Sequence, residues 1–295
     1  MRIKSNISNW LLKAMGIMSL SLFLTACEKE IEMDYHEIDP LLIVEARITN
    51  EGTDIRITQS RSMNDSVKGK CLQGADITIT PNDGTAAFKV AFDNTRQRYH
   101  ADTKGSKGTT YRLAIDYGGQ HFEGTSTMPP PMPVRSSQFV WEMMMEERFL
   151  VYEMVAEDPE PDVRNYYWYR MDRKSVRPDI RKRTGTEPYR WSAVDDRGYQ
   201  PGTISRDILC TSEKKLEEDD PDDWKSVIHE GDTITFQLMS IDVNAHEYYT
   251  SLRAGQGEGA NPHTNLTGGC LGYFVAGSVT HADTIVFRLA DVKQK

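Results

Sequence analysis

The chain has 295 residues, of which 38% are hydrophobic and 27% are charged, and its formal net charge is −9 at pH 7. This apolar content is sufficient for ordinary folded cores, and the length favours two domains. An acidic surface repels nucleic acid and anionic lipid headgroups, so neither is expected as a general electrostatic partner.

Residues 1–26 have the organisation of a secretory signal. A basic start precedes an apolar run, MGIMSLSLFLTA, at residues 15–26. This run is shorter than the about 20 apolar residues that a membrane-spanning helix needs. It ends in the letters LTAC, which resemble the lipobox of bacterial lipoproteins. We therefore predict a lipoprotein signal peptide at 1–26 and lipid attachment to the thiol of Cys27. An ordinary signal peptide followed by a chance cysteine is the alternative.

Residues 27–40 are predicted to be a tether. Removal of the signal takes away three basic and no acidic residues, which leaves 32 Lys and Arg against 44 Asp and Glu, a net charge of −12. The acidic residues directly after Cys27 cannot enter the acyl layer, so the chain must leave the membrane at once. An acidic tract in this place resembles the export signal that sends some lipoproteins to the outer face of the outer membrane. A solvated tether is the alternative.

Residues 41–128 alternate between apolar and polar side chains with a period of two. Ile55 and Ile57 share one face of a predicted strand, as do Leu113 and Ile115 in a later one. Such alternation is typical of antiparallel strands with one buried face. Turn signals such as Gly118-Gly119 separate the strands. We predict an immunoglobulin-like antiparallel β-sandwich over 41–128.

A Pro-rich linker at 129–134 is predicted to lead to a second mostly β domain at 135–295, a sandwich or barrel-like fold with one short helix. The helix is expected to begin after Asp242 and to end at Gly255. Residues 172–231 are polar and predict long loops. The methionine and aromatic residues before them suit either core packing or a ligand platform, and we favour core packing.

The beginning of this polar stretch is locally basic, against the charge of the whole chain. Arginine forks suit phosphate and carboxylate groups. The stretch therefore predicts a partner contact, for example with lipopolysaccharide phosphates or an acidic protein, and a solvated loop is the alternative. The residues of the predicted contact are Arg173, Lys174, Arg177, Arg181, Lys182 and Arg183.

Three cysteines remain when Cys27 is assigned to the lipid. Cys210 and Cys270 fall in the same half of the chain, and we predict a disulfide between them. Three buried thiols, with Cys71 as the third, are the alternative. No spacing of cysteine and histidine predicts a metal site.

The sequence predicts no cofactor, no metal and no enzymatic activity. The acidic stretch EEDDPDDW at 217–224 lacks the glycine and terminal glutamate of an EF-hand loop and is read as a solvated loop. The chain contains no His-Glu-x-x-His pair and no Gly-x-Ser-x-Gly elbow. Groups that converge from distant loops would escape such a search, so a surface hydrolase stays as an alternative.

Several stretches in order along the chain resemble the outer-membrane lipoproteins of the Bacteroidota called domain-of-unknown-function family 4249. They are CEKEI, LLIVEARIT, LQGADITITPNDG, YRLAIDYGGQHFEGTSTMPPP, DPEPDVRNYYWYR, SIDVNAHEYYTSL and NPHTNLTGGCLGYFVAG. Together they cover landmarks over nearly all of the mature chain. Ala46 stands where this pattern leads us to expect glycine, and Cys270 interrupts the glycine-rich stretch.

The resemblance implies a lipid-anchored outer-membrane protein, at the cell surface or on the periplasmic face, that accompanies a TonB-dependent outer-membrane transporter. It implies no catalytic residues. We expect a ligand-binding or accessory protein attached to the membrane through its N-terminal lipid. A cell-surface adhesin or an envelope-structure protein is the alternative, and a surface hydrolase is a weaker one.

Overall fold

The computed structural model describes residues 40–60, 69–178, 180, 188–199, 202–218, 227–255 and 261–295. These residues belong to one compact unit, Pro40–Lys295. The signal peptide and Cys27 lie outside the described residues, so the lipid anchor stays a prediction. None of the helices in the described residues is long and apolar enough to cross a membrane.

The strands of the first half follow the predicted alternation. In β7, Leu113 and Ile115 are buried while Arg112 and Asp116 are exposed, because successive side chains point to opposite faces. The described strands of this half are β1 (Leu42–Thr49), β2 (Gly52–Gln59), β3 (Asp76–Pro81), β4 (Phe88–Lys89), β5 (Ala91–Asp93), β6 (Arg98–Ala101), β7 (Thr110–Tyr117) and β8 (Gln120–Thr127).

The second half is also mainly β in its described residues. Its elements are β9 (Val134–Met144), β10 (Glu147–Glu157), β11 (Tyr166–Lys174), β12 (Arg190–Asp195), β13 (Thr203–Ser212), α3 (Glu213–Glu218), β14 (Thr233–Ile241), α4 (Val243–Ala254), β15 (Leu266–Thr267), β16 (Leu271–His281), β17 (Ile285–Val286), the 3₁₀ turn η2 (Leu289–Asp291) and β18 (Lys293–Gln294). The prediction of a mainly β fold with one short helix after Asp242 is confirmed, with α3 as an additional short turn of helix.

The expectation of long loops over 172–231 is wrong in part, because this stretch contains β12, β13 and α3. Strand β13 buries Ile204, Ile208 and Cys210 and exposes Ser205 and Leu209. The sequence of β13 therefore contains apolar residues at the spacing of a strand with one buried face. The polar residues between the buried ones hide it, since β13 is an edge strand with one wet face.

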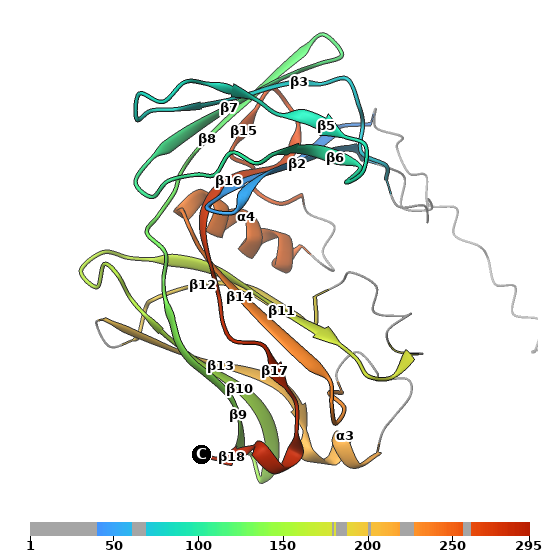
Figure 1. Ribbon diagram of the computed structural model, residues 1–295, viewed down its shortest axis with the longest axis vertical. Helices are drawn as coiled ribbons and strands as arrows, with labels where there is room; N and C mark the ends of the chain where they lie inside the picture. The colour runs from blue at the N-terminus through green and yellow to red at the C-terminus, as the bar shows by residue number, and fades with distance from the viewer. Residues whose placement is uncertain are drawn as a thin grey trace, which may run out of the picture. The chain divides into compact units, whose positions relative to one another are not determined.

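A nine-stranded sheet runs through the unit in the order β12-β11-β14-β16-β1-β2-β6-β5, with β17 paired to β14. Figure 1 shows β16, in red, crossing the blue strands of the start of the described chain, where β16 pairs with β1. Strands β1 and β16 are parallel, and Gly272 lies opposite Val44. Gly272 has φ +103°, and an added Cβ would overlap the Val44 backbone, so this pairing requires glycine.

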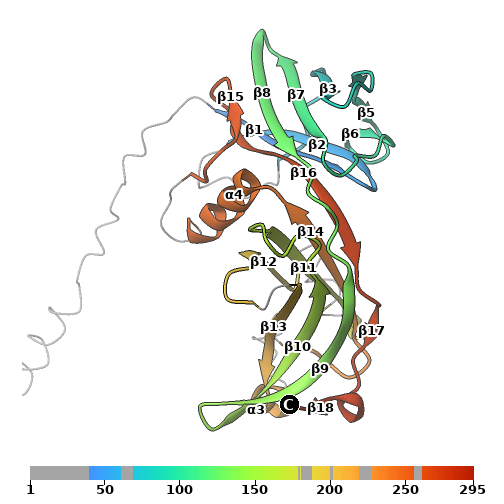
Figure 2. The ribbon, with the colours of Figure 1, turned by 90° about the vertical axis from the view of Figure 1, so that its left-hand side faces the viewer.

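Two core clusters lie on one face of this sheet. Ala46 and Phe274 are register partners, and they pack in the first cluster against the five-stranded sheet β15-β8-β7-β3-β4. Phe236 and Tyr169 pack in the second cluster with residues of the four-stranded sheet β13-β10-β9-β18. Figure 2 shows β7 and β8 near one end of the molecule and β9, β10 and β13 near the other. The arrangement is that of a β-sandwich.

The predicted linker, 129–134, lies between β8 and β9 and includes Val134, the first residue of β9. Strands β8 and β9 belong to different sheets, but earlier strands such as β1 and β2 and later strands such as β11 and β14 share the nine-stranded sheet. The predicted domain limits, 41–128 and 135–295, stay predictions.

Helix α4 covers the other face of the nine-stranded sheet. It begins at Asp242, whose Oδ1 accepts a hydrogen bond from the Ala245 N–H at 2.9 Å, and Gly255 follows its last turn. Tyr248 and Tyr249 pack with Val275 and other apolar residues of the sheet in a third cluster. Helix and sheet therefore form an aromatic layer on the face opposite the two main cores.

The cysteines correct the predicted disulfide. Cys71, Cys210 and Cys270 are free thiols. Cys210 lies in the second core cluster and Cys270 in the first, so the two are separated although they belong to the same half of the sequence. Burial raises the pKa of the Cys210 thiol to about 12, which keeps it protonated and unreactive at neutral pH.

Candidate ligand-binding pocket

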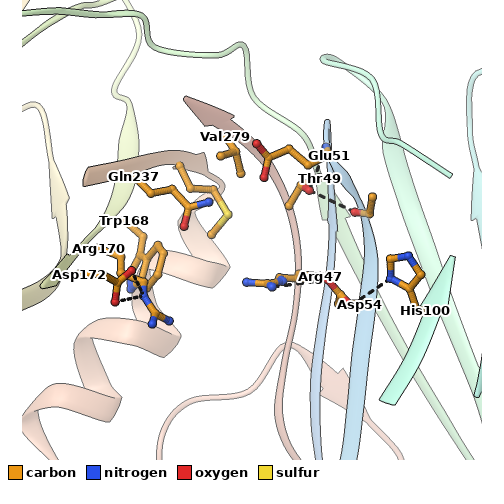
Figure 3. Close-up of a pocket in the computed structure, with 12 residues that line it drawn as sticks. Arg47, Thr49, Glu51, Asp54, His100, Trp168, Arg170, Asp172, Gln237 and Val279 are labelled. Carbon is orange, nitrogen blue, oxygen red and sulfur yellow. Dashed lines mark hydrogen bonds and ion pairs between the residues drawn. The ribbon is translucent and has the colours of Figure 1, made fainter. Parts of the chain in front are cut away.

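A pocket of about 260 Å³ lies on the α4-side face of the nine-stranded sheet, beside the aromatic layer (Figure 3). Strands β1, β2, β6, β11, β14 and β16 each contribute at least one lining residue. Met239 and Val279, which also belong to the third cluster, are among its apolar lining residues. Charged residues of both signs surround them, namely Arg47, Glu51, Asp54, His100, Arg170 and Asp172.

Alternation in β11 explains why that strand serves both a core and the pocket. Tyr167, Tyr169 and Met171 point into the second core cluster. Trp168 and Arg170, between them, therefore point to the opposite face and line the pocket. The preference for core packing in this aromatic stretch is right for the first set of side chains and incomplete for the second.

Arg47, Asp54 and His100 form the charged group on one side of the pocket. The Arg47 Nη2 and Asp54 Oδ2 atoms are 3.5 Å apart, and His100 Nδ1 is 3.1 Å from Asp54 Oδ1. The second ring nitrogen of His100 is 3.1 Å from Asp102 Oδ1. The hydrogen bond to Asp102, followed by the one to Asp54, raises the pKa of His100. The charged form of the imidazole is thus favoured here.

Arg170, Asp172 and Trp168 form the other side. Arg170 Nε donates to both Asp172 carboxylate oxygens, at 2.9 and 2.7 Å. The Trp168 ring stacks on Tyr249 of α4 with centroids 5.6 Å apart, which fixes the indole beside the pocket. Figure 3 shows Arg170 and Asp172 on one side, Arg47 and Asp54 on the other, and Gln237 above the Arg170 group. The pocket thus has a guanidinium on each side.

The pocket is suited to binding. Two guanidinium groups, an amide and three carboxylates supply hydrogen-bond donors and acceptors on rigid strands, and Trp168 supplies an apolar surface. Both His100 ring nitrogens have carboxylate partners, and the Thr49 hydroxyl donates to the Gly52 carbonyl at 3.1 Å. In the described residues, no group of three or more His, Cys, Asp and Glu side chains is placed to hold a metal ion.

The structure describes three of the six residues of the predicted basic contact. Arg173 is a correction, because it is buried with a side-chain exposure of 2%. Its Nη1 donates to the Val227 carbonyl, and its Nε lies 3.9 Å from the buried carboxylate of Asp232. Lys174 is exposed and Arg177 is half-buried. The remaining three, Arg181, Lys182 and Arg183, lie outside the described residues.

The sequence did not predict the pocket, although it carried part of the signal. Polar residues at alternate positions of β1, β11 and β14 mark a face that is not packed against another sheet. Arg173 follows Tyr169 and Met171 at intervals of two residues, so the alternation of β11 already predicts that its side chain lies on the same buried face. What the sequence lacks is the order of the strands, which brings Arg47 and Arg170 to one site.

A family model for "Domain of unknown function (DUF4249)" matches residues 28–283. The chain belongs to this family. The match extends from β1 to β16 and includes all the strands that line the pocket, while β17, η2 and β18 lie beyond it. No curated protein matches the chain.

Proposed function

We propose that this DUF4249 chain is a lipid-anchored ligand-binding or accessory protein of the bacterial outer membrane, attached through Cys27 and associated with a TonB-dependent transporter. The polar pocket on the nine-stranded sheet carries the ligand-binding part of the proposal. The basic start, short apolar run and LTAC ending support the anchor. Several acyl chains on one cysteine give stable attachment without a membrane-spanning helix.

The pocket favours a small polar ligand that offers both donors and acceptors. Arg47 and Arg170 suit a carboxylate or hydroxyl groups of the ligand, and Asp172 and Glu51 suit its hydrogen-bond donors. Charges of both signs around one pocket disfavour a purely apolar or a highly charged ligand, since either would leave polar groups without partners. The rigid strands hold these groups in place before the ligand arrives.

The ligand-binding part is tested by native mass spectrometry of protein purified from envelopes. The wild type is expected to keep a small-molecule adduct, and the double variant Arg47→Gln/Arg170→Gln is expected to lose it, with roughly tenfold or more weaker retention. Arg56→Gln is the control, because Arg56 of β2 pairs with Glu45 of β1 at 3.1 Å but does not line the pocket. Equal adducts in all three proteins would contradict the assignment of the pocket.

The accessory part is tested by affinity purification from envelopes in mild detergent. A TonB-dependent transporter is expected to co-elute in near-equal amount with the wild type. Cys27→Ser is expected to release the chain from washed envelopes into buffer, because the thioether to lipid cannot form. Recovery of the wild-type chain without a transporter would favour the adhesin alternative, and a Cys27→Ser protein that stays in the membrane would contradict the lipid anchor.

A further inference from the structure

The hairpin of β9 and β10 ends in an unusual turn. Met144 and Glu147 are the last paired residues, so the loop consists of Met145 and Glu146. Both have positive φ, +50° and +70°. Two successive positive φ angles in a two-residue hairpin loop are typical of a type I′ turn, which favours Asn-Gly, Asp-Gly or Gly-Gly. Methionine and glutamate carry a Cβ that opposes this backbone geometry.

The hairpin of β7 and β8 has the same kind of turn with different residues. Tyr117 and Gln120 are its last pair, and the loop is Gly118-Gly119 with φ +59° and +78°. Glycine adopts these angles without steric strain. The chain therefore uses glycine in one of the two hairpins and two strained residues in the other.

The strained turn also displays apolar side chains in water. Met143 is 62% exposed and Met145 fully exposed, at 102%. Figure 2 shows this turn at the lower left of the view. The strands below it are firmly packed, because Trp141 is buried under Arg148, whose guanidinium lies 4.7 Å from the ring centroid. The methionines thus sit at the tip of a rigid support and contribute nothing to the core.

Acidic residues surround the two methionines. Glu142, Glu146 and Glu147 all lie within a few residues of the turn, and Arg148, the register partner of Met143, is paired with Glu213. Such a collar opposes insertion into an anionic bilayer surface, and carboxylates are costly in the acyl region. It fits a protein surface with a basic border. Methionine, which is flexible and polarisable, adapts well to an apolar protein pocket.

We propose that the hairpin tip, residues 142–147, is a docking element that inserts Met143 and Met145 into an apolar socket of a partner protein bordered by Lys or Arg. The inference rests on the proposed function for its partner, the co-eluting outer-membrane transporter. The strain in the turn and the exposure of the methionines are explained together, because both place apolar side chains where a partner covers them.

Photo-crosslinking in intact cells tests the contact. A benzophenone amino acid replaces Met145 in the full-length chain, and the matched control replaces exposed Gln120 beside the Gly118-Gly119 turn. We expect an adduct at position 145 with the transporter, on a peptide that combines apolar residues with Lys or Arg, and none at 120. Adducts of equal yield at both positions, or none at 145, would overturn the docking element.

Co-purification of variants gives the second test. Met143→Ser/Met145→Ser is expected to reduce the recovered transporter roughly tenfold or more, while the melting temperature stays within a few degrees of the wild type. Leu209→Ser, an equally apolar-to-polar change at a 48% exposed position of β13, is expected to leave recovery unchanged.

The outcomes separate the two proposals. If the wild type recovers the transporter and the double serine variant recovers as much, the docking element is wrong and the accessory function stands. If the wild type recovers no transporter, the accessory function is wrong. In that case an adduct at 145 with a different protein, or no adduct, overturns the docking element as well, because the proposed socket belongs to the transporter.

Discussion

The β7–β8 and β9–β10 hairpins close with the same kind of turn but differ in the residues that form it. In the first, Gly118-Gly119 closes the strands without strain, and the turn exposes no large apolar side chain. In the second, Met145-Glu146 closes the strands against its own backbone preference and exposes apolar surface. A turn that serves only the fold is expected to use residues that stabilise it.

The two hairpins differ in their turns and not in the packing of their strands. Both hairpins have well-packed strands, with Leu113 and Ile115 in the first core cluster and Leu150 and Tyr152 in the second. The difference between them is confined to the tip.

The largest effect is expected at the base of the β9–β10 hairpin. Tyr152 is fully buried, and its ring centroid lies 5.5 Å from that of Phe139 and 5.3 Å from that of Phe236. Tyr152→Ala is expected to lower the free energy of unfolding by about 3–5 kcal/mol, because it leaves a large cavity. Met143→Ala at the tip is expected to change it by less than about 0.5 kcal/mol. Urea denaturation checks both, and similar effects at base and tip would remove the contrast.

The next effect concerns the glycine turn. Gly119→Val is expected to lower the free energy of unfolding by about 2 kcal/mol, because a β-branched residue is strained at φ +78°. Gln120→Val, one residue later in the extended strand, is the control and is expected to be within about 0.5 kcal/mol of the wild type. Equal denaturation midpoints for the two variants would show that this turn tolerates side chains.

Exchange of the turn residues sharpens the comparison. Met145→Asn/Glu146→Gly is expected to raise the free energy of unfolding by about 1 kcal/mol, because the favoured type I′ residues replace strained ones. The reverse exchange, Gly118→Met/Gly119→Glu, is expected to lower it by a similar amount. Thermal and urea unfolding measure both. A Met145→Asn/Glu146→Gly protein that is less stable than the wild type would show that the tip is not strained.

The smallest effect is a pH dependence beside the glycine turn. His121 lies 2.8 Å from Glu123 and 2.7 Å from Asp116, and the bonds to these carboxylates raise the pKa of His121. Its folded pKa exceeds the unfolded value of about 6.5, so its contribution is fully present below that pH and is lost as pH rises through the folded pKa. His121→Gln is therefore expected to lower the melting temperature more at about pH 6 than at about pH 8.5. The same loss at both pH values would contradict this linkage.

The sequence predicts much of the local structure of this protein. Alternation gives the buried faces of β2, β3 and β7, and Asp242 and Gly255 give the limits of α4, because these signals depend on neighbouring residues. The parallel pair of β1 and β16 was not predicted, since it joins segments more than two hundred residues apart and no local period encodes it.

The candidate sites show the same limit. The pocket depends on strand order, which places Arg47 of β1 and Arg170 of β11 on one face. The basic-contact hypothesis counted Arg173 by its charge, whereas its position in the alternation places it in the interior. The methionines at the tip of the β9–β10 hairpin were expected to pack in a core, and the backbone angles of Met145 and Glu146 place them instead in an exposed turn.

The most direct test measures two properties of one variant in the same preparation. Met145→Asn/Glu146→Gly protein is purified from envelopes in mild detergent, and both its melting temperature and its co-eluting transporter are compared with those of the wild type. We expect opposite changes in the two properties, a melting temperature about 2–4 °C higher and roughly tenfold less transporter. Undiminished transporter on a more stable chain would contradict the claim that this turn serves a partner.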